Sequence, residues 1–204
     1  MLVALVAFTL AAALLTITPG VDTAMVLRAA AAQGPRAGAA AGLGVCAGLF
    51  VWGAGAAFGL GALLSASATG YAALKWAGAG YLLYLGLRLI LRPRGGFEPG
   101  REGPRGLGNA LRRGFLTNVL NPKVGVFYAT FLPQFIPAGA NVALFSLLLA
   151  SVHAALTLIW FSALVALTVP LGRLLKRPGV VRATDRLTGA VFVAFGARLA
   201  LAER

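Results

Sequence analysis

Two polar stretches interrupt long apolar runs and contain the residues of this chain that could do chemistry. The first is Thr18-Pro19-Gly20-Val21-Asp22-Thr23, and the second is Asn118-Val119-Leu120-Asn121-Pro122-Lys123. A proline removes a backbone donor and clashes with the carbonyl four residues before it, so each stretch predicts a broken helix. We expect the freed carbonyls, those of Leu15 and Asn118, to accept hydrogen bonds from a cation.

The two breaks also contain charges and capping residues. Thr18 and Asn121 are predicted N-caps, because each precedes a proline and proline is favoured at the first helical position. Each break therefore starts a new half-helix, whose N-terminus attracts anions. Asp22 and Lys123 add one charge of each sign. A pocket with an anion-binding end and a cation-binding end suits a zwitterion.

Composition places both breaks inside a membrane. Of 204 residues, 59% are hydrophobic and 11% are charged, whereas a soluble domain carries about 25% charged residues. The mean hydropathy is +0.86, and apolar runs long enough to cross a bilayer recur along the chain. The sequence thus predicts an all-α polytopic membrane protein in contact with the lipid bilayer.

We expect six transmembrane spans. They cover Leu2–Leu27, broken at Pro19; Ala37–Leu64; Tyr71–Leu91; Arg113–Phe135, broken at Pro122; Val142–Val169, ending at Pro170; and Leu187–Ala202. A linker rich in Gly, Pro and Arg, residues 92–111, separates a first three-helix repeat (1–91) from a second (112–204).

The loops alternate in charge, and this predicts the topology. Loops two and four carry no charge, whereas the Lys and Arg of the loops gather in loops one, three and five. Since positive loops face the cytoplasm, both termini are predicted outside. Glu98, Glu102 and Asp185 are expected in cytoplasmic loops and Glu203 at the chain end, so Asp22 is the carboxylate expected within a span.

The two halves resemble each other. Gly86-Leu87-Arg88-Leu89 and Gly196-Ala197-Arg198-Leu199 share the pattern Gly-x-Arg-Leu at an offset of 110 residues. Three spans per copy give the copies opposite orientations, which predicts two inverted three-helix repeats. Pro19 and Pro122 each lie nine residues from a cytoplasmic arginine. Nine helical residues reach about 13–14 Å, so both breaks should meet near the midplane of a ~30 Å core.

The predicted substrate-binding or coupling site therefore draws on both breaks. Its residues are Thr18, Pro19, Gly20, Asp22, Asn118, Asn121, Pro122 and Lys123. A charge at mid-helix costs about 2.5–3.5 kcal/mol on insertion scales and usually lines a pathway. If transport is coupled to protons through a carboxylate, Asp22 is the candidate and His153, on one face with Thr157 and Trp160, is the alternative. Two simpler readings stay open: prolines that only kink helices, and a structural Asp22–Lys123 ion pair.

Several function classes are disfavoured. The net charge of +13 comes mostly from loops between spans and not from a basic motif with interleaved aromatics, so we expect no nucleic-acid partner. One cysteine and one histidine cannot build a metal site of the usual ligands, and no nucleophile–base pair at matching depth suggests an enzyme. We expect no cofactor.

The motifs resemble the LysE/RhtB family of bacterial amino-acid exporters. The resemblance rests on Thr18–Asp22, on Gly42-Leu43-Gly44, on Tyr81–Gly86, and most sharply on Gly114–Asn118 followed by Asn121-Pro122-Lys123 and Phe131–Phe135. It covers nearly the whole chain. Val21 departs from the family, which commonly has a second proline there.

The resemblance implies a secondary transporter that exports amino acids or close derivatives across the bacterial inner membrane, in exchange for protons and by alternating access. The alternative is a channel or a transporter for another small solute. Which amino acid moves, the coupling stoichiometry and the oligomeric state, a homodimer included, stay open.

Overall fold

The computed structural model describes residues 2–18, 20–60, 68–93, 105–175 and 177–201, and within these ranges every regular element is helical. The helices are α1 (Leu2–Ile17), α2 (Val21–Gln33), α3 (Pro35–Gly55), α5 (Ala68–Leu91), α6 (Leu107–Val119), α7 (Pro122–Val126), α8 (Val142–Leu175) and α9 (Pro178–Leu201). Two π-helical segments, η1 (Ala56–Leu60) and η2 (Phe127–Phe131), and a 3₁₀ segment, η3 (Leu132–Phe135), complete the list.

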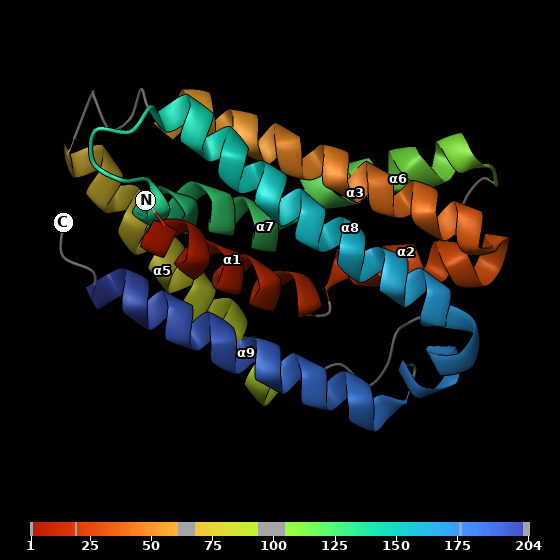
Figure 1. Cartoon of the computed structure of the whole chain (residues 1–204). Helices are drawn as coiled ribbons and strands as arrows, with labels where there is room; N and C mark the ends of the chain where they lie inside the picture. The colour runs from red at the N-terminus through yellow and green to blue at the C-terminus, as the bar shows by residue number, and fades with distance from the viewer. Residues whose placement is uncertain (1, 19, 61–67, 94–104, 176, 202–204) are drawn as a thin grey trace.

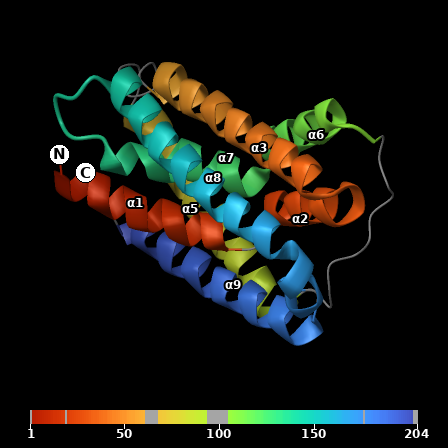
Figure 2. The same ribbon diagram turned by 45° about the vertical axis from the view of Figure 1, so that its right-hand side comes forward.

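The helices form an elongated bundle in which the chain repeatedly travels from one end to the other (Figure 1). The start of α1 and the end of α9 lie at the same end of the bundle, and the turns from α2 to α3 and from α8 to α9 lie at the opposite end (Figures 1 and 2). The start of α6 also lies at that opposite end. Such an arrangement requires an even number of passes through the bundle.

Apolar length supports membrane insertion. Among the described residues, Pro35–Gly59 and Val142–Leu167 are each long and apolar enough to cross a bilayer. Helices α1 and α2 pass the same test together, although they meet at an angle of 52°. The protein is therefore an all-helical membrane protein.

The first predicted break is the bend between α1 and α2. Helix α1 ends at Ile17, and α2 begins at Val21 after Gly20. Pro19 lies outside the described residues. The second break separates α6, which ends at Val119, from α7, which begins at Pro122.

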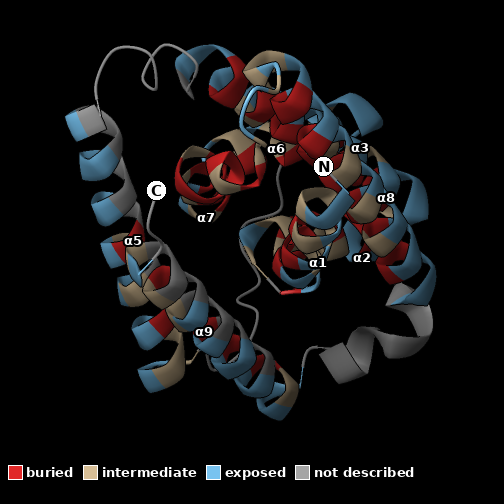
Figure 3. Ribbon diagram, turned by 60° about the vertical axis from the view of Figure 1, so that its left-hand side comes forward, coloured by how far each residue is buried: buried red, intermediate tan, exposed pale blue. Residues whose placement is uncertain are grey.

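The core surrounds the two breaks. One apolar cluster joins Phe8 of α1 to Leu49 of α3 and Phe127 of η2, and a second joins Val26 of α2 to Phe161 of α8. Figure 3 shows buried residues concentrated on α7 and on the inward sides of the helices around it, whereas the described residues of α5 and α9 are mostly exposed. In a bilayer, exposed apolar side chains contact lipid, so the buried residues mark the protein interior.

Glycines bring α3 and α6 into backbone contact. A methyl group added to Gly44 would meet the backbone of Leu111 and Phe115, and one added to Gly114 would meet the backbone of Ala41. Small residues allow this kind of close approach between membrane helices. The contact holds the end of α6, and with it the second break, against α3.

Helices α5 and α9 pack chiefly against each other. A methyl group on Gly86 would lie 2.7 Å from the carbonyl oxygen of Gly189, and one on Gly196 would lie 3.0 Å from that of Ala79. Gly86 and Gly196 differ by 110 residues, and so do Ala79 and Gly189. The two contacts are thus related by the offset that the Gly-x-Arg-Leu pattern predicts.

Several predicted helix boundaries are wrong in the second half. Helix α9 begins at Pro178 and not at Leu187, because proline is favourable at the first helical position and no further proline follows in the sequence. Asp185, predicted in a cytoplasmic loop, is consequently helical and fully buried. Helix α8 continues through Pro170 to Leu175, because membrane helices tolerate an interior proline despite the lost hydrogen bond.

The remaining boundaries differ for similar reasons. Helix α6 begins at Leu107, inside the predicted linker and ahead of Arg113, after Gly106 adopts a φ of 111°. Span one extends to Gln33 and span two starts at Pro35. Beyond Pro122 the fourth span changes from α- to π- to 3₁₀-helix, where a single half-helix was expected. Most of the linker, residues 94–104, lies outside the described residues.

Candidate functional site

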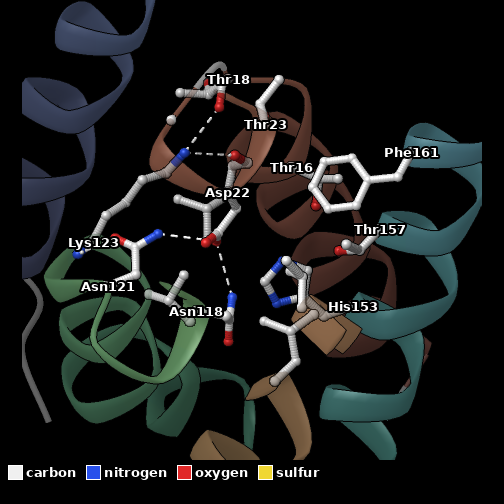
Figure 4. Close-up of a pocket in the computed structure, with 15 residues that line it drawn as sticks. Thr16, Thr18, Asp22, Thr23, Asn118, Asn121, Lys123, His153, Thr157 and Phe161 are labelled. Atoms are coloured by element: carbon white, nitrogen blue, oxygen red, sulfur yellow. Dashed lines mark hydrogen bonds between the residues drawn. The ribbon is translucent and has the colours of Figure 1, made fainter. Parts of the chain in front are cut away.

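A cavity of about 30 Å³ lies between the two broken spans. Its lining comes from the two breaks and from α3 and α8 (Figure 4). The lining residues are Leu15, Thr16, Thr18, Gly20, Asp22, Thr23, Val45, Leu49, Asn118, Asn121, Lys123, Val124, His153, Thr157 and Phe161. The structure thus brings six of the eight predicted site residues to one cavity; Pro122 is not part of the lining, and Pro19 is not described.

Asp22 lies at the centre of the polar wall. It occupies the first turn of α2, where a carboxylate complements the helix dipole. Its Oδ2 accepts a hydrogen bond from Nδ2 of Asn118 at 2.9 Å and another from Nδ2 of Asn121 at 2.9 Å. Its Oδ1 is buried and has no hydrogen-bond partner among the described residues. The carboxylate is therefore fixed from one side, and its second oxygen can accept a further donor.

Lys123 holds the end of the first half-helix. Its Nζ donates a hydrogen bond to the carbonyl oxygen of Leu15 at 2.9 Å and another to that of Thr18 at 3.0 Å. The expectation that the freed carbonyl of Leu15 accepts from a cation is confirmed. The ammonium passes close to Gly20, where an added methyl group would lie 3.5 Å from Nζ.

The carbonyl of Asn118 has a different partner from the one expected. It accepts a hydrogen bond from Nε1 of Trp52 at 3.2 Å and one from the backbone N–H of Asn121 at 2.9 Å. The prediction that this carbonyl faces a cation is wrong, because α3 packs so close to α6 that the indole reaches the break first. Trp52 also fills the space above Gly125, where an added methyl group would lie 2.6 Å from the indole.

Only one of the two predicted caps is present. The side chain of Asn121 caps α7 by accepting from the backbone N–H of Lys123 at 3.1 Å. Thr18 is no N-cap, because Gly20 occupies that position in α2. The backbone N–H of Thr18 instead donates to Leu14 and completes the last turn of α1. The first break is therefore longer than the second and has no side-chain cap.

Three residues of α8 form the opposite wall of the cavity. His153, Thr157 and Phe161 lie one helical turn apart and face the polar cluster (Figure 4). His153 is 3% exposed and Thr157 is also 3% exposed. Trp160, predicted on the same face, is not part of the lining; Phe161 is there instead.

Sequence reasoning missed the residues that support the polar cluster. A methyl group on Gly48 would lie 2.6 Å from Oδ1 of Asn118, so the amide lies directly on the α3 backbone. The hydroxyl of Tyr128 lies 3.2 Å from Nδ1 of His153, and nothing in the sequence marks this tyrosine. Neither contact has a local signal, because each joins residues from helices that are distant in sequence.

The cavity can bind polar groups but is too small for an amino acid as it stands. A water needs about 10–15 Å³ of such volume, so about two waters would fill the cavity. No group of three or more His, Cys, Asp or Glu that could hold a metal ion occurs in the described part of the chain. The lining thus combines one carboxylate, one ammonium group and several amide and hydroxyl groups around this small space.

Comparisons with known proteins find relatives along nearly the whole chain. The sequence model of the LysE type translocator family matches residues 13–203. An "Uncharacterized membrane protein YrhP" of Bacillus subtilis is 30% identical over 97% of this chain and 98% of its own. A "Homoserine/homoserine lactone efflux protein" of Salmonella typhi is 30% identical over 97% of this chain and 96% of its own.

A "Leucine efflux protein" of an Enterobacter species is 30% identical over 91% of this chain and 90% of its own. No solved structure matches the chain. Members of the matched family are transporters, which confirms the prediction that the protein is not an enzyme. The resemblance identified in the motifs is likewise confirmed: the chain belongs to the LysE family of translocators.

Proposed function

We propose that this translocator exports amino acids or close derivatives across the bacterial inner membrane in exchange for protons, by alternating access. The observation that carries the proposal is the position of Asp22 and Lys123, two groups of opposite charge that line one cavity between two broken helices. Relatives named for homoserine and leucine efflux support the substrate class.

Each of the two charged residues of the cavity, Asp22 and Lys123, has a role in this proposal. Lys123 and the N-termini of α2 and α7 bind the substrate carboxylate, because both attract anions. Asp22 carries the coupling proton or binds the substrate amine through its unpartnered Oδ1. Asn118 and Asn121 hold the Asp22 carboxylate in place. Thr18, Pro19, Gly20 and Pro122 shape the two breaks, and His153 is the second candidate for the coupling group.

An inverted repeat supplies the two states of the transport cycle. Two observations support repeats of opposite orientation: the two termini lie at the same end of the bundle, and Gly86 and Gly196 make matching contacts. The proposed repeats are residues 1–91 and 112–204, on either side of the linker 92–111. Rocking of one repeat against the other opens the cavity to each side in turn. Both termini face outward, because the loops rich in Arg then face the cytoplasm.

A channel or a carrier of another small solute is the alternative. The 30 Å³ cavity argues against a permanently open pore, because it has no room for a solute larger than water. Transport by purified protein in liposomes separates the candidates: an exporter exchanges labelled for unlabelled amino acid and responds to a pH gradient. If Asp22→Asn and Lys123→Ala both transport at the wild-type rate, the site assignment is wrong.

A further inference from the structure

His153 lies in the wall of the cavity opposite Asp22, and Tyr128 holds its ring in one orientation. Nδ1 of His153 lies 3.2 Å from the hydroxyl of Tyr128. The two rings stack, with their centroids 5.8 Å apart and an angle of 20° between their planes. The rings of Phe127 and His153 lie edge to face, with their centroids 5.7 Å apart. Tyr128 lies in the π-helical segment η2, a type of turn that is frequent at functional sites.

The contact with Tyr128 favours one tautomer of His153. The Tyr128 hydroxyl is fully buried, and Nδ1 is its hydrogen-bond partner among the described residues. A buried phenol that has one partner with a lone pair donates to it. Nδ1 is then the acceptor, and the neutral ring carries its hydrogen on Nε2.

With Nδ1 turned to Tyr128, Nε2–H is the polar group of the ring that is left for the cavity. His153 makes no other hydrogen bond within the described ranges, and its ring faces the cavity across from Asp22 (Figure 4). The amine and the carboxylate of a zwitterion find their partners at the far wall, which is formed by Asp22, Asn118, Asn121 and Lys123. The donor on His153 is therefore left for the substrate side chain, with Thr157 one turn away.

We infer that His153, positioned by Tyr128, selects substrates whose side chain carries a hydrogen-bond acceptor such as a hydroxyl or a carbonyl. This inference rests on the proposed export of amino acids. An aliphatic side chain of equal size would bury Nε2–H without a partner, and a site built to bond a hydroxyl discriminates strongly against an analogue that lacks it. Tyr128 is a positioning residue, since it acts through His153.

The test compares homoserine with norvaline, in which a methyl group replaces the hydroxyl. Labelled substrate is exchanged against unlabelled substrate in proteoliposomes without a pH gradient, so that coupling plays no part. The wild type should favour homoserine by about tenfold or more in kcat/KM. Equal rates for the two substrates would overturn the inference, whereas no transport of any amino acid would instead overturn the proposed function.

Two substitutions of His153 separate its two nitrogens. The amide nitrogen of Gln reaches the position of Nε2, whereas the Asn amide reaches only that of Nδ1. His153→Gln should keep the preference for homoserine, and His153→Asn should reduce it about tenfold. Identical ratios in the two variants would contradict the inference.

Tyr128→Phe provides a test that leaves the histidine in place. It keeps the stacked ring and removes the hydroxyl, so the imidazole is no longer held by a hydrogen bond. The preference for homoserine should fall severalfold, through a higher KM for homoserine with the norvaline rate retained. Tyr84→Phe, at an exposed position of α5, is the matched control and should leave the ratio unchanged. A wild-type ratio in Tyr128→Phe would overturn the inference even if His153→Asn does not fold.

Discussion

The ammonium of Lys123 donates a hydrogen bond of 2.9 Å to the carbonyl oxygen of Leu15, 108 positions earlier in the chain. This contact joins the two broken spans, because Lys123 belongs to the first turn of α7 and Leu15 to the last turn of α1. A residue proposed to bind substrate thus also satisfies the backbone of a broken helix. Movement of either half-helix would change the position of the charge.

Replacing Lys123 by Met should destabilise the protein. The carbonyls of Leu15 and Thr18 would lose their donor, and each buried acceptor without a partner costs about 1–3 kcal/mol. We expect the midpoint of thermal unfolding in detergent to fall by several degrees. Arg112→Met, which removes an exposed cation from α6, is the control and should unfold at the wild-type temperature. Equal midpoints for the two variants would show that Lys123 does not support the break.

Replacing Asp22 by Asn should separate coupling from exchange. The asparagine oxygen can still accept from Asn118 and Asn121, so the fold of the break is retained. The side chain can no longer release a proton. We expect accumulation driven by a pH gradient to disappear from proteoliposomes, while exchange of labelled for unlabelled amino acid continues. Glu203→Gln should leave both activities intact, and gradient-driven transport by Asp22→Asn would exclude Asp22 as the proton carrier.

Adding a methyl group to Gly48 should displace Asn118. The new Cβ would lie 2.6 Å from Oδ1 and 2.8 Å from Cβ of that residue, and overpacking of this kind costs about 1–3 kcal/mol. Gly48→Ala should therefore lower both the unfolding temperature and the exchange rate. Gly55→Ala tests the same change on the same helix with nothing within 4 Å, and it should be neutral or slightly stabilising. Wild-type exchange by Gly48→Ala would argue against a role for Asn118.

The inverted repeat makes a paired prediction. Gly86 and Gly196 are 110 residues apart. In Gly86→Ala the new methyl group would lie 2.7 Å from the nearest carbonyl oxygen of the facing helix, and in Gly196→Ala it would lie 3.0 Å from it. Both should lower the unfolding temperature, and by similar amounts. Gly80→Ala, on the open face of α5, should have no such effect. A large loss in one glycine variant and none in the other would contradict the symmetry.

A fusion at Arg204 tests the orientation. Alkaline phosphatase attached there should be active, because the enzyme matures outside the cytoplasm and the Arg-rich loops are expected inside. A reporter that is active only in the cytoplasm should be silent at the same position. The opposite pair of results would reverse the proposed topology.

The positions of the two breaks and most of the polar cluster could be predicted from the sequence. Proline, asparagine and a charge within an apolar run need compensation wherever the chain folds, so Asp22, Asn121 and Lys123 stand out without any tertiary information. The capping bond of Asn121 is local and was predicted for the same reason.

The remaining features depend on contacts between distant helices. Whether Trp52 or a cation reaches the carbonyl of Asn118 is determined by how closely α3 approaches α6. The partner of His153 depends on the π-helical turn around Tyr128. Helix α9 extends over Asp185 because its packing against α5 outweighs the polar character of its first turns, which alone suggested a loop.

The closed cavity has a thermodynamic consequence. A substrate that binds only to an open form binds with an apparent dissociation constant equal to the intrinsic value divided by the open fraction. With a cavity of about 30 Å³, the conformation described here lies outside that fraction. A small open fraction then raises the apparent dissociation constant in proportion, so a given occupancy of the site needs a correspondingly higher concentration of substrate.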